Sequence, residues 1–184
     1  MDFDEVVKKL NGKSFILLLV SKAENIIKNN VKVIKELVKH SDRGIFVTLN
    51  QPYMSFKKLL EKNHINFKDI FFIDMITATA SLYPKRIENC LFINSPSDLT
   101  ALGIAVDQAL KSMNKGTRFL FIDNLAIFLI YNDKDMVTEF MHYLVSKMRL
   151  NNVNGVIMSV QEEIGKDFIE KVMKSFCDDI IELN

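Results

Sequence analysis

Short, continuous apolar runs alternate along the sequence with segments of helical periodicity. Residues 14–20, Ser-Phe-Ile-Leu-Leu-Leu-Val, form a run typical of a strand covered on both faces. Further strands are predicted at residues 44–49, 70–74, 90–93, 118–123, 155–160 and 179–183. Strands that alternate with helices in this way predict a three-layer, doubly wound α/β fold with a mainly parallel sheet of about seven strands.

The segments between the strands carry apolar residues at helical spacing. Helices are predicted at about residues 24–40, after residue 52, from residue 95, at about residues 133–150 and from about residue 166. The inward face of the first helix is expected to consist of Ile27, Val31, Ile34 and Val38. In the helix from residue 95, we expect Ser95 as the cap, Pro96 in the first position and Asp98 in the capping-box position.

Length and composition predict one globular domain over residues 1–184. The chain is 48% hydrophobic and 26% charged, which excludes a disordered protein. Its net charge is +1, and no basic face with interleaved aromatic residues is visible, so a nucleic-acid or anionic-membrane partner is not expected. The longest apolar stretch, residues 119–131, is too short to cross a bilayer.

The cysteines and histidines offer no metal site. Cys90 and Cys177 are too few for a disulfide framework and lie in apolar runs, so we expect reduced thiols in a cytoplasmic protein. The three histidines lack metal-ligand spacing. Residues 1–10 have no apolar centre, so no signal peptide is expected.

In a parallel sheet, ligands bind beyond the carboxyl ends of the strands. The residues at those ends are Ser21 and Lys22, Asn50 and Gln51, Asp74, Asp123 and Asn124, and Gln161. Asp123 follows four hydrophobic residues, as does the carboxylate that orders magnesium in P-loop ATPases. The alternative is that Asp123 only marks the point where the chain leaves the core.

A phosphate-binding loop is not visible after the first strand. Gly12, Lys13 and Ser14 match the last three letters of such a loop, but they precede the strand and are expected to form a polar turn. Residues 21–27, where the loop belongs, contain no glycine, although a backbone phosphate cradle requires glycine conformations. Lys22 could offer one charge there or remain solvated, whereas Glu24 would repel phosphate.

Taken together, these segments resemble the RecA-like ATPase core in its KaiC-like archaeal and bacterial form. The matching segments, over roughly residues 12–184, are residues 14–20, 44–52, 94–100, 119–125 and 177–183. The resemblance implies the P-loop NTPase fold. It also implies a strand order in which the last strand lies beside the first, followed by the sixth, fifth, second and third.

The departures from this family predict a pseudo-ATPase with a degenerate Walker A motif. In the family, one or two Glu after the second strand act as the catalytic base, and here Asn50 and Gln51 stand there. An amide does not accept a proton near neutral pH as a carboxylate does. No catalytic residue and no cofactor are therefore expected. The residues of a vestigial nucleotide site would be Ser21, Lys22, Asn50, Gln51, Asp123 and Asn124.

The leading functional hypothesis is a non-catalytic regulatory or protein-interaction module. The alternative is a divergent ATP-binding protein or ATPase that holds ATP and Mg²⁺ through Asp123 and Lys22. A weaker alternative is a receiver-like phosphoacceptor at Asp74 or Asp123, although the first strand lacks the acidic pair of such domains.

A protein partner or a homo-oligomer is expected, and the interface candidates are Phe128, Leu129 and Ile130. The run 125–131 is too apolar for one amphipathic face to bury, so part of it is expected to be exposed. The alternative is that the run packs inside the chain as the start of a helix.

Overall fold

A single parallel sheet forms the centre of the computed structural model, which describes residues 14–80, 87–113 and 115–183. Its strands are β1 (Ile16–Ser21), β2 (Arg43–Thr48), β3 (Ile70–Asp74), β4 (Cys90–Phe92), β5 (Arg118–Ile122), β6 (Asn154–Val160) and β7 (Asp179–Leu183). Each pair of neighbouring strands is parallel. The predicted α/β class and seven-stranded sheet are therefore confirmed.

The strand order across the sheet is β4-β3-β2-β5-β6-β1-β7. The order that the family resemblance implied is confirmed, and β4 adds an edge beside β3. In this order the chain crosses from β1 to β2 over two strand positions that β5 and β6 fill later. The carboxyl ends of β1, β2, β5 and β6 consequently lie next to one another in the middle of the sheet, where parallel sheets bind ligands.

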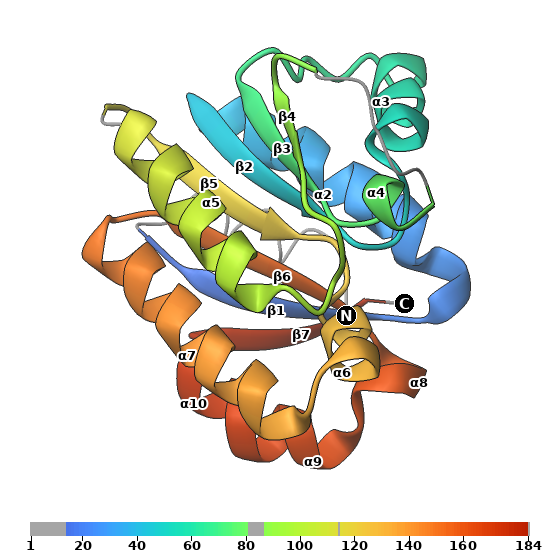
Figure 1. Ribbon diagram of the computed structural model, residues 1–184, viewed down its shortest axis with the longest axis vertical. Coiled ribbons are helices and arrows are strands. Elements are labelled where there is room, and N and C mark those ends of the chain that lie inside the picture. The colour runs from blue at the N-terminus through green and yellow to red at the C-terminus, as the bar shows by residue number, and fades with distance from the viewer. Residues whose placement is uncertain (1–13, 81–86, 114, 184) are drawn as a thin grey trace.

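Helices cover both faces of the sheet and complete three layers (Figure 1). On one face lie α2 (Ile26–His40) and α3 (Tyr53–Lys62). On the other lie α5 (Leu99–Ser112), α6 (Leu125–Tyr131), α7 (Lys134–Leu150), α8 (Gln161–Ile164), α9 (Lys166–Phe168), the π-helical turn η2 (Ile169–Met173) and α10 (Lys174–Phe176). Two short connecting turns are η1 (Ala23–Asn25) and α4 (Thr77–Ala80).

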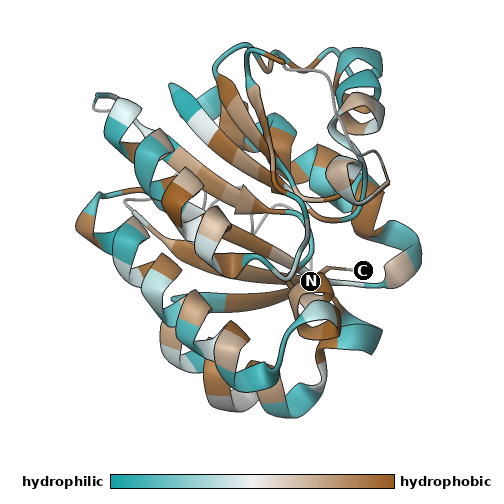
Figure 2. Ribbon diagram, viewed as in Figure 1, coloured by the Kyte–Doolittle hydropathy of each residue, from teal (hydrophilic) through white to brown (hydrophobic). Residues whose placement is uncertain are grey.

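Two hydrophobic clusters, one on each face, explain why the strands are apolar without interruption. In β1, Leu17 and Leu19 belong to the cluster beneath α2 and α3, whereas Leu18 and Val20 belong to the cluster beneath α5 and α7. The apolar residues of the strands accordingly fill the middle of the molecule (Figure 2). A strand with both faces buried needs an apolar residue at every position.

The inward face of the first helix differs from the prediction. α2 begins at Ile26, after the η1 turn, and Ile27 is 39% exposed. The buried residues of α2 are Ile26, Asn29, Asn30, Val31, Val33, Ile34 and Leu37. The face is rotated because two buried asparagines take part in it through hydrogen bonds to the sheet, which a hydrophobic pattern does not reveal.

The predicted start of the helix after β4 was wrong. α5 begins at Leu99, and its N-cap is Asp98, whose Oδ1 accepts a hydrogen bond from the Ala101 N–H at 2.9 Å. Ser95 and Pro96 precede the helix in a turn closed by the Asp98 N–H on the Ser95 carbonyl. The Pro96 carbonyl accepts from Asn132 Nδ2, so a tertiary contact holds this residue outside the helix.

Candidate functional site

A buried polar cluster lies where β1, β2 and β5 end, and we call it the strand-exit cluster. Its members are Ser21, Thr48, Asn50, Asp123 and Asn124. Asp123 is at its centre and is only 1% exposed. Its Oδ1 accepts the Leu49 N–H at 2.7 Å, and its Oδ2 accepts the Asn50 N–H at 3.1 Å. The carboxyl group therefore points into the turn that follows β2.

The side chain of Thr48 makes a further contact with Asp123. The Thr48 hydroxyl lies 2.5 Å from the Gln51 carbonyl, to which it donates, and 3.1 Å from Asp123 Oδ2. One hydroxyl proton serves one acceptor at a time, so a proton on Asp123 would satisfy both contacts together. Burial raises the pKa of Asp123 to about 7, although the N–H groups of Asn50 and Leu49 act to lower it. Burial thus outweighs the hydrogen bonds to the carboxyl, including the one from Thr48, and the carboxyl keeps its proton close to neutral pH.

Two asparagine side chains tie three strands together at this point. Asn50 Nδ2 donates to the Asp123 carbonyl at 3.2 Å, and Asn124 Nδ2 donates to Asn50 Oδ1 at 3.2 Å. Asn124 Oδ1 accepts from the N–H groups of Ala126 and Val160, so it caps α6 and reaches β6. Asn50 holds β2 against β5 through these bonds.

Two residues that the sequence analysis missed complete the cluster from α2. Asn30 Nδ2 donates to the Asp123 carbonyl at 3.1 Å, and Asn29 Nδ2 donates to the Ser21 hydroxyl at 2.9 Å. Both asparagines are buried. The signal in the sequence was their position among apolar residues of a helix. Asparagine has a low helix propensity, and a buried asparagine requires hydrogen-bond partners.

The exit of β1 has no phosphate cradle. Lys22 is exposed and extended, and the chain then turns at η1, which the Asn25 N–H closes on the Lys22 carbonyl. The Ala23 N–H donates to Glu162 Oε2 of α8 at 3.3 Å. A backbone N–H at the place where a phosphate would be expected is therefore already hydrogen-bonded to a carboxylate. Lys22 and Gln51 reach the strand-exit cluster only through their carbonyls, which accept the hydroxyls of Ser21 and Thr48.

Asp74, at the end of β3, is also buried and fully engaged. Its oxygens accept the N–H groups of Tyr53 at 2.7 Å and of Ile76 and Thr77 at 2.8 Å, together with the Thr77 hydroxyl at 2.5 Å. These bonds hold the starts of α3 and α4. Asp74 and Asp123 are both closed to solvent, and this does not suit a phosphoacceptor.

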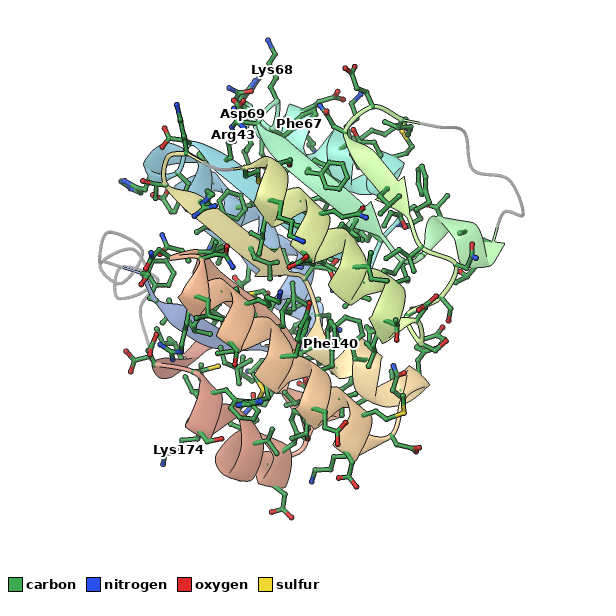
Figure 3. All side chains as sticks on the ribbon, turned by 60° about the vertical axis from the view of Figure 1, so that its left-hand side comes forward. Arg43, Phe67, Lys68, Asp69, Phe140 and Lys174 are labelled. Atoms are coloured by element: carbon green, nitrogen blue, oxygen red, sulfur yellow. The ribbon has the colours of Figure 1, made fainter. Side chains whose placement is uncertain are left out.

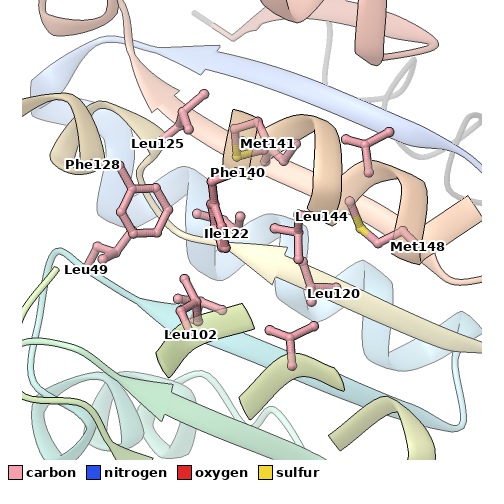
Figure 4. Packing of buried hydrophobic residues seen from close by; sticks show 14 of the residues in the cluster. Leu49, Leu102, Leu120, Ile122, Leu125, Phe128, Phe140, Met141, Leu144 and Met148 are labelled. Carbon is pink, nitrogen blue, oxygen red and sulfur yellow. The ribbon is translucent and has the colours of Figure 1, made fainter. Parts of the chain in front are cut away.

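The apolar run after Asn124 forms α6 and is mostly internal. Phe128 is fully buried and packs edge-on against Phe140, with 5.9 Å between ring centroids (Figure 4). Phe128 was therefore wrongly expected at an interface, because its ring fills the core between α6 and α7. Leu129 is partly buried, and Ile130 is 66% exposed at the end of α6. Of the three candidates, Ile130 is the one that the surface displays.

The described residues offer no metal centre and no helix that could span a membrane. Within residues 14–80, 87–113 and 115–183, no group of three or more His, Cys, Asp or Glu side chains could hold a metal ion. Among the described helices, none combines the length and apolar character needed to cross a bilayer. Gly12 and Lys13 of the supposed phosphate motif lie outside the described residues, and Ser14 is exposed before β1.

Comparison with known proteins supports the fold through structure alone. No family model matches the sequence, and no curated protein does. The structure is similar to a KaiC-like protein of the hyperthermophilic archaeon Pyrococcus horikoshii, PH0186, with a TM-score of 0.64 and 11% identity over 94% of this chain and 73% of that one. It is also similar to the uncharacterised PH0321 from the same organism, solved in complex with an unknown peptide, with a TM-score of 0.69 and 9% identity over 98% and 82% of the chains.

A third protein of Pyrococcus horikoshii, PH0250, matches with a TM-score of 0.59 and 12% identity over 100% of this chain and 88% of that one. The chain therefore has the KaiC-like, RecA-like P-loop ATPase fold, as the resemblance predicted. Sequence identities of 9–12% show the fold alone.

Proposed function

We propose that this chain is a pseudo-ATPase, a KaiC-like domain that has kept the fold without the chemistry and acts as a regulatory or protein-interaction module. The observation that supports this most strongly is the enclosure of Asp123. Its two carboxyl oxygens already accept the backbone N–H groups of Leu49 and Asn50, and the side chain is 1% exposed.

For Asp123 to order Mg²⁺, the ion or its water would have to reach a carboxyl that is 1% exposed and that the backbone of Leu49 and Asn50 covers. If that turn moved away, each buried N–H left without an acceptor would cost about 1–3 kcal/mol. The carboxyl would also have to lose its proton in a buried place where its pKa is about 7. A magnesium-ordering role therefore requires the turn after β2 to open first.

Nor do the residues around Asp123 supply a catalytic base. The Asn50 amide donates to the Asp123 carbonyl and accepts from Asn124, so it is part of the scaffold of the cluster. At the exit of β1, the Ala23 N–H is occupied by Glu162, and Glu24 is exposed beside it. A triphosphate at the exit of β1 would face these two carboxylates as well as Lys22, and the negative charges repel it.

The interaction role rests on a different set of observations. PH0321, which is similar in fold, was solved in complex with an unknown peptide. The described surface of the present chain displays several large apolar side chains, among them Ile104 and Ile130. We accordingly propose a protein partner, either a separate protein or a second copy of this chain. Cys90 and Cys177 are both free, which fits a cytoplasmic location as part of this proposal.

Phosphate release from ATP and Mg²⁺ tests the proposed loss of catalysis. We expect the purified full chain to release no phosphate above the level of a Lys22→Ala variant. Lys22 is exposed and makes no side-chain contact that the fold needs, so this control keeps the structure intact. Turnover that disappears in Lys22→Ala would contradict the proposal and favour the alternative of a divergent ATPase.

A further inference from the structure

A groove of about 500 Å³ lies between α2 and α3, and we call it the α2–α3 groove. Its apolar lining consists of Ile27 and Val31 from α2 and Leu59 from α3. Ile27 is 39% exposed, and Leu59 is partly buried. Asn29 and Asn30 hold α2 to the strand-exit cluster, and the rotation of the helix that results leaves Ile27 at the border of the groove.

The two helices stand apart because they cover different strands. α3 packs over β2 and β3, where Phe56 stacks on Phe46 with 4.5 Å between ring centroids and Tyr53 lies edge-on to Phe72. α2 packs against β6, and β5 separates β6 from β2 in the sheet. β7 lies at the far edge, beyond β1, so its acidic residues are on the other side of α2 from the groove.

Lysines follow the groove along α2. Lys28, Lys32, Lys35 and Lys39 succeed one another at intervals of four, three and four residues, which places them on one side of the helix. All four are exposed, and Lys28 and Lys32 line the groove itself. Lys39 pairs with Glu36 at 2.6 Å, at the end of α2 that is farther from the groove lining. The stripe of lysines is therefore continuous over three turns of the helix.

α3 adds two exposed lysines, Lys58 and Lys62. The acidic residue of this helix, Glu61, lies 3.8 Å from Lys57. Lys57 is two positions from Leu59, so it points to the opposite flank of α3, away from the groove. The groove thus has lysines on both of its helices, while the ion pair of α3 lies on the outer flank.

The charge of this part of the molecule does not cancel. Residues 22–69, which contain η1, α2, β2 and α3, carry ten basic and five acidic side chains, a net charge of +5. Glu162 of α8 accepts the Ala23 N–H beside the groove, and adding both Glu162 and Glu163 still leaves +3. The helices on the opposite face, α5 to α10, sum to zero. The positive charge is therefore a property of the α2 and α3 face.

The composition of the groove indicates what kind of anion fits it. Among the residues that the structure describes, no aromatic side chain lines the groove, and its cations are lysines. Base stacking and bidentate phosphate contacts, which nucleic-acid sites use, have no counterpart here. Helices that bind membranes project apolar side chains into the bilayer, whereas Ile27 and Leu59 lie in a recess. Lysines around an apolar recess suit a protein segment that carries both acidic and apolar side chains.

A second copy of the chain is disfavoured by the same charges. If two copies met through this face, each would oppose its lysines to those of the other. Like charges across an interface disfavour it, whereas carboxylates of a different protein are attracted.

We infer that the α2–α3 groove binds an acidic, amphipathic segment of another protein. Apolar side chains of that segment would cover Ile27, Val31 and Leu59, and its Asp and Glu residues would pair with the lysines along the groove. This inference rests on the proposed interaction role and gives it a surface and a partner chemistry.

A displayed library of random peptides, each about 16 residues long, tests the inference when it is selected on the full chain. We expect the most enriched peptides to combine Asp and Glu with Leu, Ile or Phe. Each should bind a Lys28→Glu, Lys35→Glu variant about tenfold more weakly or worse. Both lysines are exposed, so the variant should keep the fold.

A matched charge control is Lys166→Glu, Lys174→Glu. It changes the net charge by the same amount on the opposite face, and both lysines are exposed. Figure 3 shows Lys174 on α10, at the opposite end of the molecule from Arg43 and Lys68. We expect this control to keep the affinity within about twofold. Equal losses in the two double variants would mean that only the overall charge matters, and this would overturn the inference.

The apolar part of the groove has its own pair of variants. Ile27→Ser should weaken the same peptides about fivefold, because it removes an apolar contact from the centre of the groove. Leu150→Ser removes a side chain that is 80% exposed at the end of α7, and it should leave the affinity unchanged. An affinity that Ile27→Ser leaves unchanged would show binding by charge alone and would contradict the groove.

Other occupants are tested at the same salt concentration with single-stranded DNA of about 20 nucleotides and with vesicles of phosphatidylserine and phosphatidylcholine. We expect both to bind more weakly than the peptides. Tighter binding that is lost in Lys28→Glu, Lys35→Glu would assign this face to nucleic acid or membrane and overturn the inference. Self-association in sedimentation that the same variant abolishes would assign it to a second copy.

The inference and the proposed function fail in different ways. Enriched peptides that bind the charge-reversed variant as well as the unchanged chain would refute the groove and leave the interaction role standing. Turnover in the ATP assay would refute the loss of catalysis and leave the groove untouched.

Discussion

The strand-exit cluster differs in character from the open groove between α5 and α7, which is lined by Gly103, Ile104, Met136, Glu139, Phe140 and Tyr143 and which we call the α5–α7 groove. The cluster is polar and closed, and the chain itself satisfies its central carboxyl through Leu49 and Asn50. The groove is apolar and open, and Ile104 and Met136 in its walls are 55% and 52% exposed. At the strand ends, where this fold commonly binds ligands, the chain's own groups make the hydrogen bonds. The exposed apolar side chains lie instead on the helices.

This difference follows from what each region does for stability. A buried donor that loses its acceptor costs more free energy than a hydrogen bond contributes. Substitutions within the cluster should accordingly lower the free energy of unfolding. The side chains of the groove that are exposed are already in water, so substitutions there should hardly change it.

The largest effect is expected from Asp123→Ala. This change leaves the N–H groups of Leu49 and Asn50 without acceptors in a buried site. The free energy of unfolding should fall by about 4 kcal/mol, since each orphaned donor costs about 1–3 kcal/mol and a cavity adds to the loss. Urea denaturation at pH 6 measures it. A loss below about 1 kcal/mol would show that the carboxyl is not held as described.

A pH dependence should follow from the same residue. The pKa of Asp123 is about 7 in the folded chain and 3.8 in the reference state, so the folded chain binds a proton that the unfolded chain releases between these values. Its contribution to stability is complete below about pH 4 and is lost as the pH rises through 7. Unfolding free energy should fall on the order of 3 kcal/mol from pH 5 to pH 8.

Denaturation across this pH range compares the chain with Asp123→Asn, which has no proton to titrate at this position. We expect the decline between pH 5 and pH 8 to be much flatter in the variant. Equal slopes in the two proteins would assign the pH dependence to other groups.

A smaller effect is expected from Asn50→Ala. The change removes the bond to the Asp123 carbonyl and the acceptor for Asn124, at the edge of the cluster. Unfolding free energy should fall by about 1–2 kcal/mol. Gln51→Ala is the matched control, because Gln51 contacts the cluster through its carbonyl, and it should change stability by less than about 0.5 kcal/mol. Equal losses in both would mean that Asn50 does not brace the strands.

The smallest effect on stability is expected in the groove. Ile104→Ser and Met136→Ser each remove a side chain that is more than half exposed. Each should change the unfolding free energy by less than about 0.5 kcal/mol. Thermal and urea denaturation of both variants measure this. A loss of about 2 kcal/mol would show that these side chains belong to the core, and the contrast between the two regions would fail.

The sequence predicted the sheet better than it predicted the helices. Continuous apolar runs mark buried parallel strands, and the order of those strands came from the family resemblance. The inward face of α2 was misplaced because Asn29 and Asn30 are buried through bonds to Ser21 and Asp123. The start of α5 was misplaced because the Pro96 carbonyl serves a contact with Asn132.

The sequence predicted where the candidate site lies, but not that the carboxyl of Asp123 is buried and hydrogen-bonded by the chain itself. Asp123 and Asn50 were found from their places at strand ends. Leu49 and Thr48 contact this carboxyl because of the register in which β2 pairs with β5. The sequence alone does not reveal that register. The α5–α7 groove was not predicted, since Ile104 and Tyr143 lie on separate helices, and a periodicity does not say which helices are neighbours.

Nucleotide binding by the strand-exit region tests the central claim most directly. An NMR titration of the ¹⁵N-labelled full chain with Mg²⁺ and ATP follows the amide signals of Ala23, Leu49 and Asn50, the backbone donors that Glu162 and Asp123 occupy. Mg²⁺ alone is the control. We predict that none of these signals shifts in a saturable way at millimolar ATP. Saturable shifts of all three with ATP, absent with Mg²⁺ alone, would show that the site opens for nucleotide and would contradict the account.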